Sequence, residues 1–244
     1  MKAIFKRELG AYFKTPLAYV FIGLFVACAS LLFFEFNLNS KSAVLTNYFV
    51  NICYVFIVAT PLLTMKMFSE ERKLKTDQLL LTAPIKVRDI VFGKFLSGLC
   101  VLLISVTVTL IFLFVLGIFG NPPVAQSLVG YLGILLYGAM LIAIGMFVST
   151  LTQNQVISAV VTMAIVGVLS LSGNLNIDFT AFINGKLLFL GHFLNGILDF
   201  ININARFYDF SQGILNVVPI VYFLSITALF VLLTVNVIER RRWR

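Results

Sequence analysis

The chain has 244 residues, of which 60% are apolar and 11% are charged, and its formal net charge is +8. Average soluble domains are about 45–50% apolar and about 25% charged, and so few charges cannot cover a water-soluble surface. The composition argues against a soluble enzyme, a nucleic-acid-binding protein and a disordered chain. It predicts an integral membrane protein with no sizeable soluble domain.

Residues 1–16 are predicted to form an amphipathic helix. Four apolar or aromatic side chains share one side of this helix, opposite Arg7: Phe5, Leu9, Tyr12 and Phe13. This pattern is typical of a helix that lies in the membrane interface, and Pro16 ends it. The simpler alternative is a basic segment that only helps to orient the chain in the membrane.

Six stretches are apolar enough to cross a membrane, which takes about 20 residues. They are Leu17–Phe36, Tyr48–Met65, Phe95–Phe119, Ser127–Leu151, Val156–Ser172 and Val217–Ile238. Because these runs are continuously apolar rather than alternating, they favour helices over a β-barrel. We therefore predict an all-α membrane protein, a single domain over residues 1–244, with six transmembrane helices. In the fourth span, four glycines indicate close helix packing: Gly130, Gly133, Gly138 and Gly145.

Basic residues are distributed unequally among the segments that link these spans. Residues 1–16 hold four, residues 66–94 hold seven and the tail after the last span holds four, whereas the opposite side holds only Lys41, Lys186 and Arg206. Under the positive-inside rule, both termini and the 66–94 loop are expected to be cytoplasmic. That topology requires an even number of spans, which six satisfies.

The 66–94 loop is the only substantial cytoplasmic element that the sequence predicts. The charges Glu70-Glu71-Arg72-Lys73 precede a leucine cluster, Leu79–Leu81, and Thr82-Ala83-Pro84 is expected to stop this helix. A helix this short is not stable alone, and bare leucines would form an exposed apolar patch. We expect it to dock on a partner or on the chain's own helices; a solvated loop is the simpler alternative.

Residues 173–216 form the second long non-spanning region, on the outer side. Short apolar runs are separated there by Gly185, Gly191 and Gly196. Runs this short cannot span, so they predict re-entrant or interfacial helices. His192, the only histidine of the sequence, has no cluster of carboxylates or cysteines to join and is not expected to be a ligand or a catalyst.

The sequence lacks the motifs of the common energy-converting and hydrolytic sites. It has no G-x-x-x-x-G-K-[ST] phosphate loop, no H-E-x-x-H, no G-x-S-x-G and no membrane-embedded carboxylate pair. Cys28, Cys53 and Cys100 fall in apolar stretches and are interpreted as isolated thiols. We therefore predict no catalytic residue, no cofactor and no metal site. An ATP-independent secondary transporter or channel subunit, an intramembrane enzyme and a structural membrane anchor stay open as alternatives.

The loop between the second and third spans reads M-F-S-E-E-R-K-L-K-T-D-Q-L-L-L-T-A-P over residues 67–84. With the basic entry helix, the six spans and the outer segment before the last span, it resembles the permease subunit of ABC-2 type ATP-binding-cassette transporters. Within that family, it is most similar to the gliding-motility-associated permease. Members commonly have glycine where Lys75 stands and glutamate where Gln78 stands. The resemblance implies a type V exporter-like fold in a bacterial inner membrane.

The resemblance also implies partners and a mechanism. A cytoplasmic ABC ATPase dimer would bind and hydrolyse ATP, and its work would drive export or transmit force across the membrane, with gliding motility as one outcome. A second permease subunit would be a copy of this chain or a different one, in one version with an extracytoplasmic domain. Membrane lipid is the remaining partner, and no nucleic acid is expected.

The site residues are likewise implied by the resemblance. The helix Glu70–Leu81 would be the coupling helix on the ATPase, and residues 1–16 would be the connecting helix. The ATPase-coupling residues would be Glu70, Glu71, Arg72, Lys73, Asp77, Gln78, Leu79, Leu80, Leu81 and Pro84, and the connecting-helix residues would be Phe5, Arg7, Leu9, Tyr12 and Phe13. Reversing the charge of Glu71 or Arg72, or replacing Leu79–Leu81 by polar residues, is expected to uncouple ATP hydrolysis from transport while leaving the fold intact.

Overall fold

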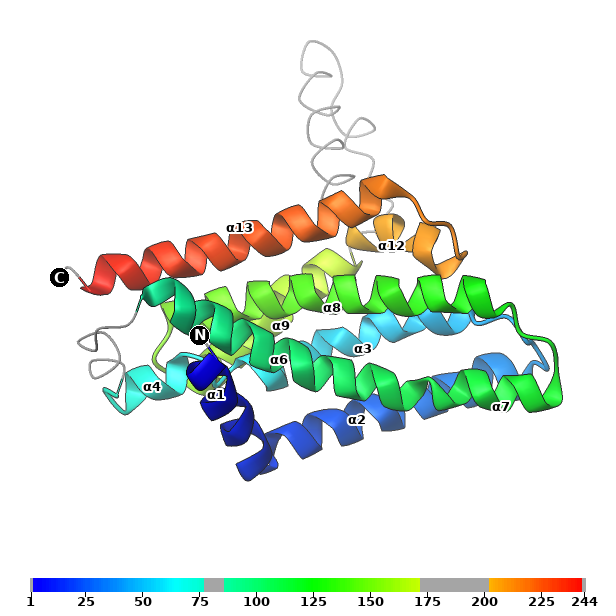
Figure 1. The fold of residues 1–244 in the computed structure, drawn as a ribbon, viewed down its shortest axis with the longest axis horizontal. Coiled ribbons are helices and arrows are strands. Elements are labelled where there is room, and N and C mark those ends of the chain that lie inside the picture. The colour runs from blue at the N-terminus through cyan, green and yellow to red at the C-terminus, as the bar shows by residue number, and fades with distance from the viewer. Residues whose placement is uncertain (1, 77–85, 172–201, 243–244) are drawn as a thin grey trace, which may run out of the picture.

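A computed structural model of the chain describes residues 2–76, 86–171 and 202–242. All regular secondary structure in these ranges is helical, and most of the long helices run side by side along one axis (Figure 1). The helices are α1 (Lys2–Lys14), α2 (Pro16–Phe33), the π-helix η1 (Phe34–Asn39), α3 (Thr46–Thr64), α4 (Ser69–Lys73), α6 (Val87–Thr109), α7 (Ile111–Phe119), α8 (Val124–Leu151), α9 (Gln155–Leu171), α12 (Ile203–Ser211) and α13 (Val217–Arg242).

Five helical stretches in the described residues are long and apolar enough to cross a membrane. They are α2 continued by η1, α3 together with α4 (Thr46–Lys73), α6 continued by α7, α8, and α13. Each corresponds to a predicted span, although α6 begins at Val87 rather than near Phe95. The predicted fifth span, Val156–Ser172, corresponds to α9, an apolar helix of 17 residues that is shorter than the other five. The count of six crossings therefore stays a prediction.

Helix α8 lies at the centre of the bundle. In its most apolar window 78% of the residues are buried, against 22% in the window of α13, and α8 packs against α3, α6, α9, α12 and α13. Its glycines make this possible, because a Cβ atom at any of the four predicted positions would lie within 2.6 Å of a neighbouring side chain. Those neighbours are Phe49 at Gly130, Phe210 at Gly133, Leu102 at Gly138 and Thr64 at Gly145. The predicted close packing is confirmed.

The short helix α12 reaches into the bundle from one end. Its first turn lies beside the middle of α8, where the Tyr137 hydroxyl is 3.4 Å from Asn204 Oδ1. The residue after it, Gln212, accepts a hydrogen bond of 2.6 Å at its carbonyl from Gln126 near the start of α8. A helix of nine residues covers only part of the bundle's length, and the re-entrant character of residues 173–216 stays a prediction. Residues 173–201 of the predicted re-entrant segment, His192 included, lie outside the described residues.

The segments richest in basic residues gather at one end of the molecule. Figure 1 shows the N-terminus, α1, α4, the start of α6 and the end of α13 at this end, with the α7–α8 turn and the α12–α13 connection at the other. We call the first the basic end and define it by these segments. Helix α1 crosses the basic end at a steep angle to α2, whereas the long helices run away from it (Figure 1).

Candidate functional site

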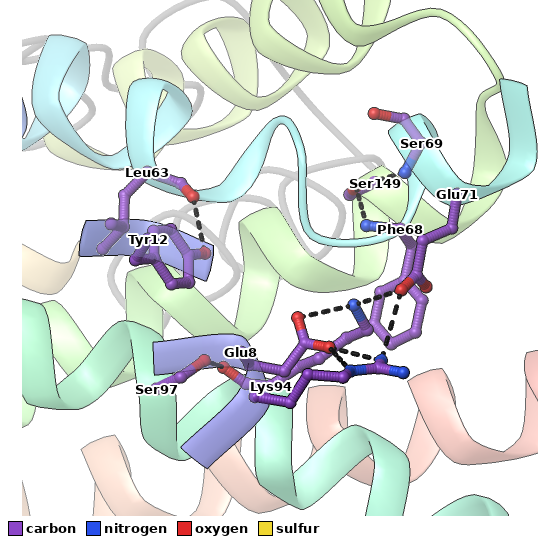
Figure 2. Close-up of polar contacts among 10 residues, drawn as sticks. Glu8, Tyr12, Leu63, Phe68, Ser69, Glu71, Lys94, Ser97 and Ser149 are labelled. Atoms are coloured by element: carbon purple, nitrogen blue, oxygen red, sulfur yellow. Dashed lines mark hydrogen bonds and ion pairs between the residues drawn. The ribbon is translucent and has the colours of Figure 1, made fainter. Parts of the chain in front are cut away.

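Helix α1 packs its apolar side on the chain's own helices. Ile4 and Tyr12 are buried, whereas Lys6, Arg7 and Lys14 are exposed. A Cβ atom at Gly93 of α6 would lie 2.9 Å from the Ile4 side chain, so α1 and α6 are in close contact. The Tyr12 hydroxyl donates a 3.0 Å hydrogen bond to the Leu63 carbonyl near the end of α3 (Figure 2). The predicted amphipathic helix is therefore present, and much of its apolar face is covered by protein.

Four charged side chains meet where α1, α4 and α6 come together, as Figure 2 shows for three of them. Lys94 Nζ lies 2.9 Å from Glu8 Oε2 of α1 and 2.9 Å from Glu71 Oε1 of α4. Arg7 Nη2 lies 2.6 Å from Glu8 Oε1 and 3.7 Å from Glu71 Oε1. We call Arg7, Glu8, Glu71 and Lys94 the charge cluster. Its two cations and two carboxylates balance, which is the condition under which charges can be buried.

Lys94 is the centre of the charge cluster. Its side chain is only 3% exposed, and its ammonium also lies 5.2 Å from the centre of the Phe68 ring, within the range of a cation–π contact. Burial alone would raise the pKa of the Glu8 carboxyl, but Lys94 and Arg7 more than offset that effect and hold the pKa below its ordinary value. Glu8 is therefore a carboxylate at neutral pH, and it keeps the buried ammonium paired.

A second set of bonds joins α4 to the end of α8. The Ser149 hydroxyl accepts hydrogen bonds from the backbone N–H groups of Phe68 (3.0 Å) and Ser69 (3.1 Å), as drawn in Figure 2. These two N–H groups stand at the start of α4, where a helix provides no backbone acceptor for them. The Thr150 carbonyl, at the negative end of the α8 dipole, accepts from Arg72 Nη1 at 2.9 Å and from Arg241 of α13.

Helix α4 ends earlier than the sequence predicts. The expected helix Glu70–Leu81 is wrong in its extent, because α4 spans only Ser69–Lys73. Lys75 then adopts a left-handed backbone with φ of 56°. Its N–H bonds back to the Arg72 carbonyl (3.2 Å), and that of Thr76 bonds to the Glu71 carbonyl (3.0 Å). This pair of bonds is a Schellman motif, which terminates a helix.

The predicted ATPase-coupling residues divide into three groups. Glu71 points into the charge cluster, Arg72 points toward the end of α8, and Glu70 is half-buried. Lys73 is exposed, as are the residues that follow α4, with Leu74 64% exposed. The remaining predicted residues, Asp77, Gln78, Leu79, Leu80, Leu81 and Pro84, lie outside the described residues.

This geometry corrects one expectation. In the wild type, the Glu71 carboxylate lies 2.9 Å from the buried ammonium of Lys94. A cation at position 71 would place two positive charges next to each other there. Reversing the Glu71 charge is therefore expected to disturb the fold itself, whereas the sequence alone suggested that the fold would stay intact. A single buried ion that loses its partner is strongly destabilising.

An open cleft of about 340 Å³ lies between α1 and α4, and the charge cluster forms part of its lining. Charged side chains from both helices line it, together with Tyr12, Met67 and the exposed Leu74. The described part of the chain offers no cluster of residues that could hold a metal ion. The arrangement is suited to holding a short helix firmly and to presenting an apolar tip beside a mixed-charge cleft.

The sequence did not identify Lys94, Glu8, Ser149 and Thr150 as site residues. Lys94 pairs with residues 86 and 23 positions away, and Ser149 bonds to residues 80 and 81 positions away. No local pattern encodes such pairs. The one available signal was Lys94 itself, a lysine at the edge of a long apolar run, where burial requires a partner.

A family model described as ABC-2 family transporter protein matches residues 14–242 of the chain. No curated protein matches the chain. The family match covers nearly the whole chain and begins at the last residue of α1. The chain therefore belongs to the ABC-2 transporter family, whose members are generally non-catalytic membrane components of transporters. The predicted resemblance to ABC-2 permeases is confirmed at this level.

Proposed function

Because the chain belongs to this family, we propose that it is the permease subunit of an ABC-2 transporter and that a separate ABC ATPase dimer drives it. In this proposal, the ATPase contacts the chain at α4 and at the exposed residues that follow it. The observation that carries the proposal is how α4 is held: this five-residue helix is bonded directly to α1, α6 and α8, while the residue after its far end, Leu74, is exposed.

Because of these bonds, a force on α4 cannot displace this helix without also acting on its neighbours. Glu71 joins it to α6 through Lys94, and this lysine also holds α1 through Glu8. Ser149 joins its first turn to α8, and Arg72 shares the Thr150 carbonyl with Arg241 of α13. A displacement of α4 is therefore passed to α1, α6, α8 and α13 together. This is what a coupling element needs, since an isolated turn of helix would bend or unfold instead.

The proposal includes the topology and the partners. The basic end faces the cytoplasm under the positive-inside rule, α9 is the sixth crossing, and a second permease subunit completes the pathway. No charged residue occurs between Phe95 and Ile177, which supports an amphiphilic cargo or an output of force rather than ions. Force transmission in gliding motility, suggested by the resemblance of the loop at residues 67–84, is one such output.

The test is co-purification with the ATPase from native bacterial membranes, followed by ATPase assays on the reconstituted complex. Leu74→Asp changes an exposed side chain and leaves the contacts of α4 in place. Burying a leucine at an interface is worth about 1.5–3 kcal/mol, so we expect about a 10- to 100-fold loss of bound ATPase. Leu215→Asp is the matched control, because Leu215 is 62% exposed and lies in the α12–α13 connection at the opposite end.

Two outcomes would contradict the proposal. The first is recovery of an ABC ATPase that is equally complete with Leu74→Asp and with Leu215→Asp, since the contact would then lie elsewhere. The second is transport by the purified chain in liposomes without ATP, which is the behaviour of a secondary transporter or a channel. Loss of ATPase stimulation by Leu74→Asp, with an unchanged thermal unfolding profile, would support it.

A further inference from the structure

A second feature of the basic end lies apart from α4. A groove of about 610 Å³ opens between the start of α6 and the end of α13, lined by Lys86, Val87, Arg88, Glu239 and Arg242. We call these five residues the basic groove. Three of them are cationic and one is acidic, so the lining carries a net positive charge. Lys86, Arg88 and Arg242 are exposed, whereas Glu239 is half-buried.

We propose that the basic groove binds the phosphate head group of an anionic phospholipid of the cytoplasmic leaflet. Clusters of arginine and lysine at the cytoplasmic ends of transmembrane helices attract such lipids through their charge. Helix α6 begins at the groove, with Lys86 as its N-cap residue and Asp89 in its first turn, and backbone N–H groups at a helix start favour a phosphate. The inference rests on the topology in the proposed function, with the basic end in the cytoplasm, and does not rest on a bound ATPase.

The surface that continues from the groove identifies the ligand as an amphiphile. On α6, Arg88 is followed at helical spacing by Phe92 and Leu96, both exposed at 39% and 38%. On α13, Leu232, seven residues before Glu239, is 56% exposed. Residues four or seven apart share one face of a helix. A charged groove at the end of an apolar face fits a phosphate with acyl chains better than it fits a free anion or an acidic peptide.

The experiment compares lipids that differ only in head-group charge. The purified full chain is exchanged into nanodiscs of phosphatidylcholine with increasing fractions of phosphatidylglycerol, and retained lipid is measured by native mass spectrometry. Each basic residue near an anionic surface contributes about fivefold in affinity, so Lys86→Gln/Arg88→Gln should weaken retention of phosphatidylglycerol about 25-fold. Lys73→Gln/Lys75→Gln removes the same charge at the basic end and should retain it like the wild type.

A variant within the apolar stripe tests the second half of the proposal. Phe92→Gln leaves the groove charges unchanged and should lower retention of long-chain phosphatidylglycerol but not of a short-chain analogue. Each variant is accepted only if its size-exclusion profile matches the wild type. Arg242→Gln replaces the double variant if Lys86→Gln/Arg88→Gln does not fold, with an expected loss of about fivefold.

Four results would overturn the proposal. If Lys73→Gln/Lys75→Gln lowers retention of phosphatidylglycerol as much as Lys86→Gln/Arg88→Gln does, the effect is one of general surface charge. If the wild type shows no preference for phosphatidylglycerol, the groove does not bind an anionic lipid. Displacement of the lipid by millimolar inorganic phosphate would make the groove a free-anion site. Loss of a co-purifying ATPase in Lys86→Gln/Arg88→Gln, with lipid retention unchanged, would make it a protein contact.

Discussion

Replacing Lys94 by methionine tests the charge cluster directly. The substitution keeps the length and most of the volume of the side chain but removes the cation that both carboxylates contact at 2.9 Å. The Lys94 side chain is 3% exposed and those of Glu8 and Glu71 are 13% and 20% exposed, so water replaces little of what is lost. Removing one partner from a buried ion pair costs about 3–5 kcal/mol.

The assay is the apparent melting temperature of the detergent-solubilised chain, followed by fluorescence-detected size exclusion after heating. For a chain of this size, about 1 kcal/mol corresponds to about 2–4 °C, so Lys94→Met should lower the midpoint by roughly 6–20 °C. Lys6→Met removes an exposed lysine of α1 and should leave it unchanged. The triple variant Glu8→Gln/Glu71→Gln/Lys94→Met removes the stranded charges and should recover much of the loss. A midpoint for Lys94→Met within error of Lys6→Met would refute the argument.

Two further predictions use matched substitutions and the same assay. Lys75→Gly should stabilise the chain by about 1 kcal/mol, because glycine adopts the left-handed backbone at φ of 56° without the steric cost of a side chain. Lys73→Gly, inside α4, should destabilise the chain by about as much. Changes of the same sign for the two variants would contradict the Schellman motif. Gly133→Ala should destabilise by about 1–3 kcal/mol, because its Cβ would lie 2.6 Å from the Cβ of Phe210 in α12. At Gly23 an added Cβ atom would have no atom within 4 Å, so Gly23→Ala should be neutral or stabilising. A Gly133→Ala chain as stable as the Gly23→Ala chain would argue against the contact between α8 and α12.

The membrane helices could be predicted from the sequence because one local property determines them. Continuous apolar runs must form helices in lipid, and the predicted spans match the helices of the bundle to within a few residues at most ends. The largest difference is the start of α6 at Val87, eight residues before the predicted Phe95. The apolar pattern stops at Lys94, but the helix does not, because Glu8 and Glu71 neutralise that lysine inside the protein.

The site was less predictable because its bonds join distant parts of the chain. The charges at residues 70–73 identified the segment, yet they gave no indication that Glu71 points inward and that Lys73 is exposed. The length of α4 was also hidden, since the leucines that follow favour a longer helix by propensity. The left-handed residue at position 75 ends it instead.

Under the proposed function, helix α8 is the element that links a short helix at one end of the molecule to a short helix nearer the other. Both α4 and α12 are too short to be stable alone, with five and nine residues, and each is bonded to α8, through Ser149 in one case and Tyr137 in the other. These two residues are 12 positions apart on one continuous helix, a span of about 18 Å. Helix α8 is buried and closely packed at its glycines, so it can shift only with its neighbours. A displacement of α4 along the α8 axis must therefore reach α12 or break the Ser149 bonds.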